Sequence, residues 1–237
     1  MPAPYPLIDM PPGDFSNIFD FQAINMAAAH NQFIQGINAM VYHAPRIPEE
    51  KVQPFVKFSL IFLEHLHHHH TLEETLLFPE FEKKLGQGSL SVNIEQHHDF
   101  VPQIDELERH LKDIQSEKVK YDGKALVERI DGFGDIMIEH LNEEIATLES
   151  SRMRSAFTEK ELKDIDAAFM KEVMASLDLY TALPFSVVCG NPATPWFPPL
   201  PAPLKWATKW WFYRRHKECW EFGQLDLSGK PRPEYGI

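Results

Sequence analysis

Four long amphipathic patterns run through the first two thirds of the chain and restrict what it can fold into. Apolar residues recur there at helical spacings, over about residues 15–41, 54–85, 90–116 and 123–151. Short stretches with glycine or proline separate the patterns, and strand-like alternation is absent from all four. Four long helices with short connections are typical of an up-down arrangement. The sequence therefore predicts an all-α fold, an up-down four-helix bundle.

The segments on either side of this bundle differ from it in composition. Residues 1–13 are rich in proline and are expected to form an irregular N-terminal arm, with the bundle over residues 14–152. Thr158 and Glu161 have the spacing of a capping box and predict a further helix. The remaining chain is rich in proline and contains all five tryptophans. We expect residues 153–237 to form extra C-terminal helices and a Pro/Trp-rich extension that packs on the bundle.

The acidic balance of the chain limits the partners it can bind. Its formal net charge of −12 disfavours nucleic acid and anionic membranes, since both attract positive potential. No run of about 18 apolar residues is present, so no membrane span is expected. The two cysteines are widely spaced and form no disulfide framework, and no signal-peptide pattern opens the chain. These features predict a cytoplasmic protein.

One short segment departs from this acidic balance. The stretch LKWATKWWFYRRHK carries five basic residues and no acidic one. Tryptophan and arginine favour membrane interfaces, so the segment suits the surface of a bilayer. Packing of Trp206 and Trp210 on the bundle explains the same residues, and we favour that interpretation.

A run of four histidines, HHHH at positions 67–70, lies inside the second helical pattern. A purification tag would lie at a terminus, so the choice is between a polar surface and a site. His69 shares its helical face with an apolar stripe and with Glu73. His70 and Glu74 share a poorer stripe and form the reserve pair, for the case in which the helix is rotated by one residue.

The other three patterns each place a histidine on their apolar side. These are His30, His97 and His140, and Glu144 follows His140 by one helical turn. A single such histidine is usually a hydrogen-bonded core residue, but four of them with two glutamates indicate a site. Burial of two unpaired carboxylates would cost several kcal/mol each, and no lysine or arginine lies on these inner faces. A multivalent cation is the natural compensation.

The spacing of these side chains favours two metal ions. An i, i+4 pair lies on adjacent turns, roughly 6 Å apart, so His69 with Glu73 and His140 with Glu144 can each share an ion. Four imidazoles and two carboxylates suit a pair of ions with bridging carboxylates. Nitrogen and oxygen ligands without thiolate fit iron, manganese or zinc better than calcium or magnesium. A single zinc ion would leave one buried glutamate over.

Four motifs on these helices, AAAHNQFIQGIN, HHTLEETLLFP, EQHHDF and HLNEE, occur in this order. Together they resemble the haemerythrin-like (HHE cation-binding) family over about residues 14–150. The resemblance implies a non-haem di-iron centre, in which two iron ions are joined by an oxo or hydroxo group. Its register favours Glu73 over Glu74. The implied ligands are four terminal histidines and two bridging glutamates: His30, His69, His97, His140, Glu73 and Glu144.

The chain departs from the oxygen-carrying haemerythrins at two positions. Those proteins have HxxxH on the third helix, and here the earlier position is Asn93. They also end with HxxxxD, whereas here Glu144 follows His140 after three residues. The resemblance then implies that one histidine ligand is missing and that an iron ion would have an additional open or water-filled position. The arrangement is more similar to the haemerythrin-like domain of the F-box iron-sensing ubiquitin ligases, although no F-box is visible.

Three functions fit such a centre. An oxidase or oxygenase would activate O2 for a small organic substrate, and residues 153–237 would wall its pocket or simply cap the bundle. A sensor or carrier of O2, nitric oxide or iron needs the same ligands and no substrate. A structural metal site needs the ligands alone. We lean to a non-haem di-iron oxidoreductase because a carrier requires only the bundle.

Overall fold

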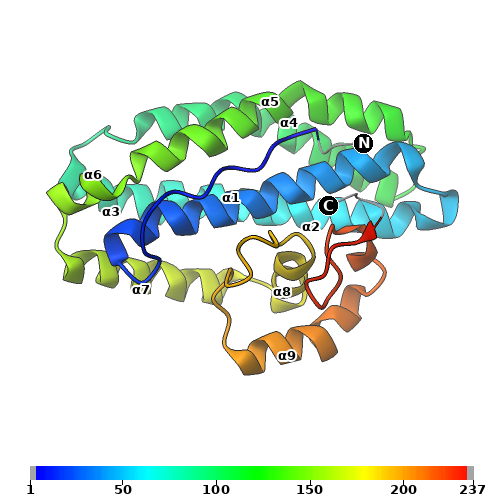
Figure 1. The fold of residues 1–237 in the computed structure, drawn as a ribbon. Coiled ribbons are helices and arrows are strands. Elements are labelled where there is room, and N and C mark those ends of the chain that lie inside the picture. Colours follow the sequence, from blue (N-terminus) through cyan, green and yellow to red (C-terminus); the bar gives the residue numbers. More distant parts are fainter. Residues whose placement is uncertain (1–3, 234–237) are drawn as a thin grey trace.

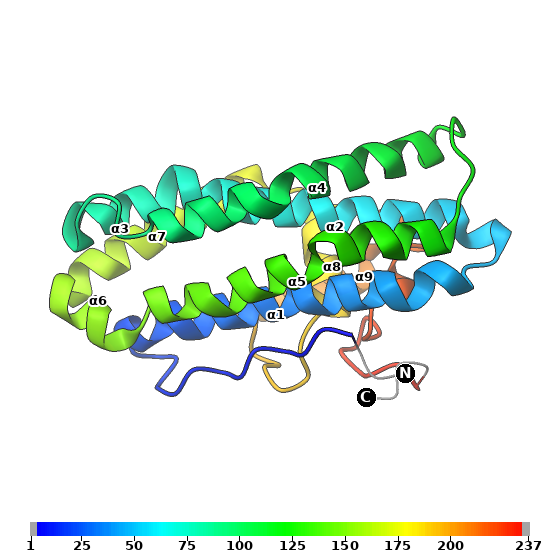
Figure 2. The same cartoon turned by 90° about the horizontal axis from the view of Figure 1, so that it is seen from above.

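The computed structural model describes residues 4–233, and within this range it contains helices and turns with a single β-bridge between Leu225 and Pro231. Four long helices form the bundle shown in Figures 1 and 2: α1 (Ile18–His43), α2 (Val52–Leu72), α4 (Ser91–Gln115) and α5 (Gly123–Thr147). Both α2 and α5 pack against α1 and against α4, so that α1 and α4 lie on a diagonal. The predicted all-α bundle fold is confirmed.

Local capping explains where several of these helices begin. The side chain of Asn17 accepts a hydrogen bond from the backbone N–H of Phe19, so α1 begins at Ile18, three residues later than predicted. Asp122 caps α5 in the same way. Gly123 follows it because a Cβ atom there would lie 1.9 Å from the carbonyl oxygen of Ala44. The connection after α1 therefore packs directly on the start of α5.

The second helical pattern is interrupted, which corrects the prediction of one helix over residues 54–85. A π-helical turn, η3 (Glu73–Leu77), follows α2 and leads into α3 (Phe78–Leu85). Pro79 is the physical reason, because it has no N–H and its ring crowds the carbonyl group four residues earlier. The N–H of Phe78 bonds instead to the carbonyl oxygen of Glu73, five residues earlier.

The N-terminal arm is extended and is held along α1 by two asparagines. The side chain of Asn38 accepts from the N–H of Tyr5 and donates to its carbonyl group, at 3.0 and 2.8 Å. Asn31 does the same for Ile8, at 2.8 and 3.0 Å. Seven residues of helix and three residues of extended chain both span roughly 10 Å, so the two spacings match.

The C-terminal part lies against one side of the bundle, over α1 and α2 (Figure 1). It comprises four helices and two short 3₁₀ turns: α6 (Ser150–Ala156), α7 (Glu159–Ser176), α8 (Leu179–Val188), α9 (Ala202–Trp210), η4 (Phe212–His216) and η5 (Trp220–Phe222). Phe185 of α8 and Phe222 of η5 both pack on Phe58 of α2, with ring centroids 6.5 and 6.0 Å apart. The expected capping box at Thr158 begins α7.

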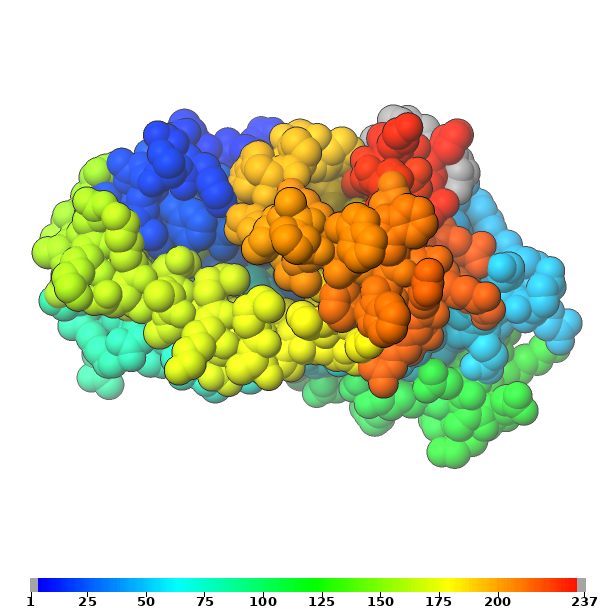
Figure 3. Space-filling view, turned by 90° about the horizontal axis from the view of Figure 1, so that it is seen from below, coloured from blue at the N-terminus to red at the C-terminus, as the bar shows by residue number. Residues whose placement is uncertain are grey.

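The preference for packing of the tryptophans on the bundle is wrong for α9. Trp206 and Trp210 are 66% and 51% exposed, and Trp211 is 58% exposed, whereas Trp220 is buried. The reason is that α9 packs mainly on α8 and η4, so its outer face meets no bundle helix. Figure 3 shows α9, in orange, on the outside of the molecule. No helix among residues 4–233 is long and apolar enough to cross a bilayer.

Candidate metal centre

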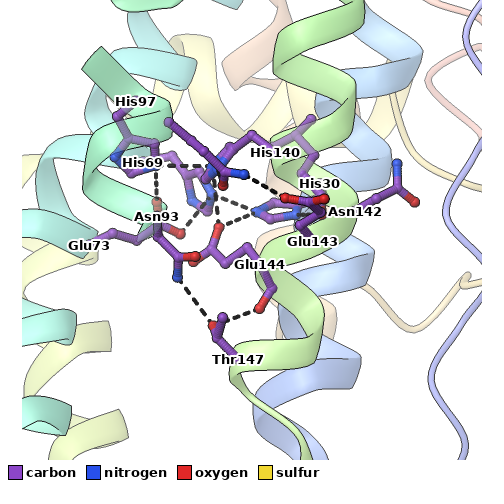
Figure 4. Close-up of polar contacts among 12 residues, drawn as sticks. His30, His69, Glu73, Asn93, His97, His140, Asn142, Glu143, Glu144 and Thr147 are labelled. Atoms are coloured by element: carbon purple, nitrogen blue, oxygen red, sulfur yellow. Dashed lines mark hydrogen bonds and ion pairs between the residues drawn. The ribbon is translucent and has the colours of Figure 1, made fainter. Parts of the chain in front are cut away.

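Six side chains from all four bundle helices and the π turn converge in the middle of the bundle (Figure 4). They are the six residues expected from the sequence: His30 from α1, His69 from α2, Glu73 from the π turn, His97 from α4, and His140 and Glu144 from α5. Five of them are exposed by no more than 1%. The side chain of His69 is 12% exposed, and it is therefore the member that faces an opening.

The four histidines form two pairs. The Nε2 atoms of His30 and His69 lie 3.1 Å apart, and those of His97 and His140 lie 3.0 Å apart. Each pair joins histidines from two different helices. Two Nε2 atoms so close together offer two donor nitrogens to one ion, which is the arrangement that mixed nitrogen and oxygen metal sites use.

Each glutamate lies between the two histidine pairs. Glu73 places Oε1 2.9 Å from Nε2 of His69 and Oε2 3.8 Å from Nε2 of His97. Glu144 places Oε2 3.4 Å from Nε2 of His30 and 3.5 Å from Nε2 of His140. Both carboxylates therefore reach both pairs, as bridging ligands must.

The outer nitrogen atoms of three of the four histidines are held by hydrogen bonds, two of them to groups of the bundle helices α4 and α5 and the third, that of His97, to Glu74. Nδ1 of His30 lies 2.7 Å from the carbonyl oxygen of Leu141, and Nδ1 of His140 lies 3.1 Å from Oε1 of Gln96. A proton on Nδ1 satisfies these acceptors and leaves Nε2 with its lone pair toward the centre. Such outer hydrogen bonds orient metal-binding histidines in proteins.

The structure separates the two members of the reserve pair, His70 and Glu74. Glu74 is partly exposed and accepts from Nδ1 of His97 at 2.6 Å, on the outer side of that ring. Glu73 has no exposed surface and points inward. Glu74 is thus placed to orient a histidine rather than to reach the centre itself.

His70, in contrast, lies inside the centre, although the helical periodicity had given it only as a member of the reserve pair. It is 4% exposed, and neither of its ring nitrogens has a hydrogen-bond partner. Its ring centroid is 4.2 Å from that of His97 and 5.6 Å from that of His140. Successive helical residues differ in direction by about 100°, so the side chains of His69 and His70 can lie at opposite edges of one wide inner face of α2. His70 therefore approaches the second histidine pair.

The other two histidines of the run, His67 and His68, lie outside the centre. The helical pattern directs them away from the inner face, toward solvent, but both are half-buried. Nε2 of His67 lies 3.3 Å from Oδ1 of Asp105 on α4, and Nε2 of His68 lies 2.8 Å from Oγ of Ser176 at the end of α7. The helices on either side of α2 thus cover both rings away from the centre.

The electrostatics of the centre favour a bound cation. Burial raises the pKa values of Glu73 and Glu144 well above their ordinary value of 4.5, and neighbouring carboxylates raise them further. Burial lowers the pKa of His69 to about 3 and that of His140 to about 2. The imidazoles are therefore neutral at pH 7, and none of the four carboxylate oxygens has a hydrogen-bond partner. Buried acceptors of this kind fit metal ions, which would satisfy them.

The geometry defines a helical bundle with an internal set of nitrogen and oxygen donors, and the comparisons with known proteins agree. Residues 24–149, more than half of the chain, match the family described as Hemerythrin HHE cation binding domain. The chain belongs to this haemerythrin family, whose domains bind metal ions. It is also 25% identical over 242 residues to the dimeric xanthone biosynthesis cluster protein R11 of Cryptosporiopsis sp. (strain 8999), covering 97% of this chain and 89% of the relative. No solved structure matches the chain significantly.

Proposed function

We propose that the protein is a non-haem di-iron oxidoreductase that uses O2 to oxidise a small organic molecule. One observation carries this proposal: a cavity of about 400 Å³ borders His69, the one member of the six that is not fully buried. Small-molecule sites commonly have volumes of about 300–1,000 Å³. A sensor or carrier of O2, nitric oxide or iron has no use for a cavity of this size beside its centre.

Two iron ions would be held by the two histidine pairs, with Glu73 and Glu144 between them. When bound, the iron ions would supply the electrons that O2 accepts. The protein would keep the imidazoles neutral, exclude water from the centre and leave access only beside His69. The burial of the other five side chains supports this role.

We further propose that His70 completes the second pair. Asn93 stands where oxygen carriers have a histidine, and its amide is 1% exposed and donates to Oγ1 of Thr147 at 3.1 Å. That hydroxyl in turn donates to the carbonyl oxygen of Glu144. Asn93 is thus engaged in supporting α5, whereas His70 has two unpaired nitrogens beside His97.

The relative supports a role in small-molecule chemistry. Its name places it in a dimeric xanthone biosynthesis cluster, and the similarity covers 97% of this chain. The extension over residues 153–237 is therefore shared along with the bundle. This supports a function in which both parts take part in biosynthesis.

The test combines metal analysis with O2 chemistry. Protein loaded anaerobically with Fe(II) should contain two iron ions per chain, and addition of O2 and a reductant should give continued O2 consumption. A coloured oxygen adduct that reverses when O2 is removed would instead establish a carrier. Protein that retains manganese or zinc and ignores O2 would establish a different centre.

The role of His70 has its own test. His70→Phe should weaken binding of the second metal ion by about 10- to 100-fold, so that the metal content falls toward one ion per chain. His67→Phe, a change in the same histidine run but outside the centre, should leave the metal content unchanged. Equal metal content in both variants would overturn the proposed role.

A further inference from the structure

The cavity beside His69 lies between the bundle and the C-terminal part of the chain. Its walls come from α1, α2, α7, α8 and residues 197–199. On α7 the lining residues Asp166, Phe169, Met170 and Val173 follow the helical spacing, so one face of α7 covers the cavity. Figure 3 shows the outer side of this cover, with α7 in yellow-green and the segment that precedes α9 in gold. The extension thus encloses a space that the bundle alone would leave open.

The lining is mainly apolar and includes six phenylalanines. Phenylalanines from the start of the chain, the bundle, α7, α8 and the proline-rich segment surround the space: Phe15, Phe21, Phe33, Phe169, Phe185 and Phe197. Aromatic rings gain specific offset or edge-to-face contacts with a ring that they enclose, beyond the burial of area. The six phenylalanine rings therefore offer an aromatic occupant contacts that an aliphatic chain cannot make.

The polar groups of the cavity accept hydrogen bonds rather than carry positive charge. No lysine or arginine is among the described residues that line it, and its one carboxyl group is Asp166, whose pKa is raised by burial. Gln22 and Gln32 use their amide N–H groups on the carbonyl oxygens of Ile18 and Ser186, at 3.2 and 2.9 Å. An anionic ligand would therefore find no cationic side chain among these lining residues, whereas a hydroxyl group would find acceptors.

His65 is the most specific of these acceptors. It lines the cavity, it is 7% exposed, and its Nε2 atom is buried without a partner. Burial lowers the pKa of His65 to about 4. A hydrogen bond to the backbone of Thr181 opposes that shift, which is the effect expected when the imidazole is the donor. The ring is therefore neutral at pH 7, and Nε2 retains an unpaired lone pair beneath the cavity surface.

The position of His65 relates this acceptor to the metal centre. His65 and His69 are four residues apart on α2, so their side chains lie on adjacent turns, roughly 6 Å apart. Phe33 packs on His69 with ring centroids 5.0 Å apart and forms part of the same wall. A ring whose hydroxyl group meets His65 would extend toward His69.

We propose that this cavity binds a neutral aromatic phenol of two or three fused rings, with its hydroxyl group donating to Nε2 of His65 and its ring edge beside His69. The proposal deepens the proposed oxidoreductase function by naming its substrate class, and it rests on that function for the reaction alone. Binding itself depends only on the cavity.

The experiment is a calorimetric titration of the full-length, metal-loaded protein under nitrogen, so that no turnover interferes. The probes share one ring system: 2-naphthol, naphthalene and 2-naphthoate. We expect 2-naphthol to bind about tenfold more tightly than naphthalene, for one added hydrogen bond, and 2-naphthoate to bind more weakly than both. Equal or tighter binding of the carboxylate would overturn the proposal.

Two sets of variants locate the binding. His65→Phe should remove the preference for 2-naphthol over naphthalene, and His65→Gln, which keeps an acceptor, should restore part of it. Val173→Trp should fill the cavity and lower the affinity for 2-naphthol at least tenfold. Met174→Trp, on the exposed side of the same helix, should not. If His65→Phe fails to fold, the two tryptophan variants still decide the matter, because unchanged binding in Val173→Trp contradicts the proposal.

The two proposals fail in different ways. Binding of 2-naphthol as expected, in protein that consumes no O2 when loaded with iron, would leave the cavity assignment intact and overturn the oxidoreductase. O2 consumption that none of the three probes affects, with no calorimetric binding, would overturn the phenol site and leave the oxidoreductase.

Discussion

At the scale of single residues, burial and hydrogen bonding distinguish the side chains at the centre from similar ones beside it. Glu73 and Glu74 are adjacent in sequence and identical in chemistry. One has no exposed surface and lies between two histidine pairs, and the other is partly exposed and supports a ring from outside. Their difference follows from direction alone, because neighbouring helical residues point about 100° apart.

The first prediction compares these two glutamates. Glu73→Gln should remove most of the bound metal, because an amide is a poor bridging ligand and only one carboxylate would remain between the pairs. Glu74→Gln should weaken metal binding by about 10-fold or less, since the amide oxygen can still accept from Nδ1 of His97. Metal content of the purified variants by mass spectrometry checks both. Greater loss in Glu74→Gln would reverse the assignment.

The second prediction concerns pH and metal-free protein. The pKa values of Glu73 and Glu144 lie well above 4.5 in the folded state, so the folded protein holds protons that the unfolded chain has released. The contribution of these two groups to the free energy of unfolding should therefore fall as pH rises from about 4.5 through these raised pKa values. Below about pH 6.5 the buried histidines oppose this fall, so the test belongs above that pH. Histidines with lowered pKa values, such as His30, are neutral in both states above about 6.5 and add nothing there.

Urea denaturation of metal-free protein at pH 7 and pH 9 measures this dependence. The isosteric control, Glu73→Gln with Glu144→Gln, has no such protons to lose and should show a smaller decrease in stability. Metal-loaded protein should also show a smaller decrease, because its carboxylates are already ionised. A decrease in the double variant equal to that of the unchanged protein would contradict the explanation.

At the scale of helices, periodicity predicted the inner faces well but not the details of one backbone segment. His30, His69, His97 and His140 each lie on an apolar stripe with period 3.6, so the sequence alone brought them to one interior. The π turn at Glu73–Leu77 was missed because its cause is a single proline within an otherwise regular pattern. The position of His70 was missed because the apolar stripe was taken to have room for one histidine of the run. The inner face of α2 is wide enough for both His69 and His70.

The third prediction tests how Pro79 shapes the centre. Pro79→Ala restores an N–H group, so the π turn should relax toward a regular α-helix and rotate Glu73 relative to α3. Metal-free protein should become more stable, by up to about 3 kcal/mol, while its affinity for metal falls. Pro54→Ala, on α2 but fifteen residues before His69, is the control and should leave the affinity for metal unchanged. Urea denaturation and metal titration provide the two measurements.

At the scale of the whole molecule, segments far apart in sequence pack on the four-helix bundle and cover surfaces that it would otherwise expose. The extension encloses a cavity beside His69, and the N-terminal arm seals the groove between α1 and α5 through Tyr5. Neither arrangement was predictable in detail, because both depend on tertiary hydrogen bonds and shape rather than on period. The division into an arm over residues 1–13, a bundle over 14–152 and an extension over 153–237 stays a prediction.

The last prediction uses two glycines of α5 to measure how strongly the arm is bound. A Cβ atom at Gly134 would lie 2.0 Å from the hydroxyl oxygen of Tyr5, whose backbone is fixed by Asn38, whereas Gly132 has nothing within 4 Å. Gly132→Ala should therefore raise the free energy of unfolding by about 1 kcal/mol, the usual helical gain. Gly134→Ala should lower it by about 1–3 kcal/mol, because the arm must move. Chymotrypsin should also cleave the arm after Leu7 faster in Gly134→Ala alone, and equal cleavage in both variants would show that the arm contributes little to the closed bundle.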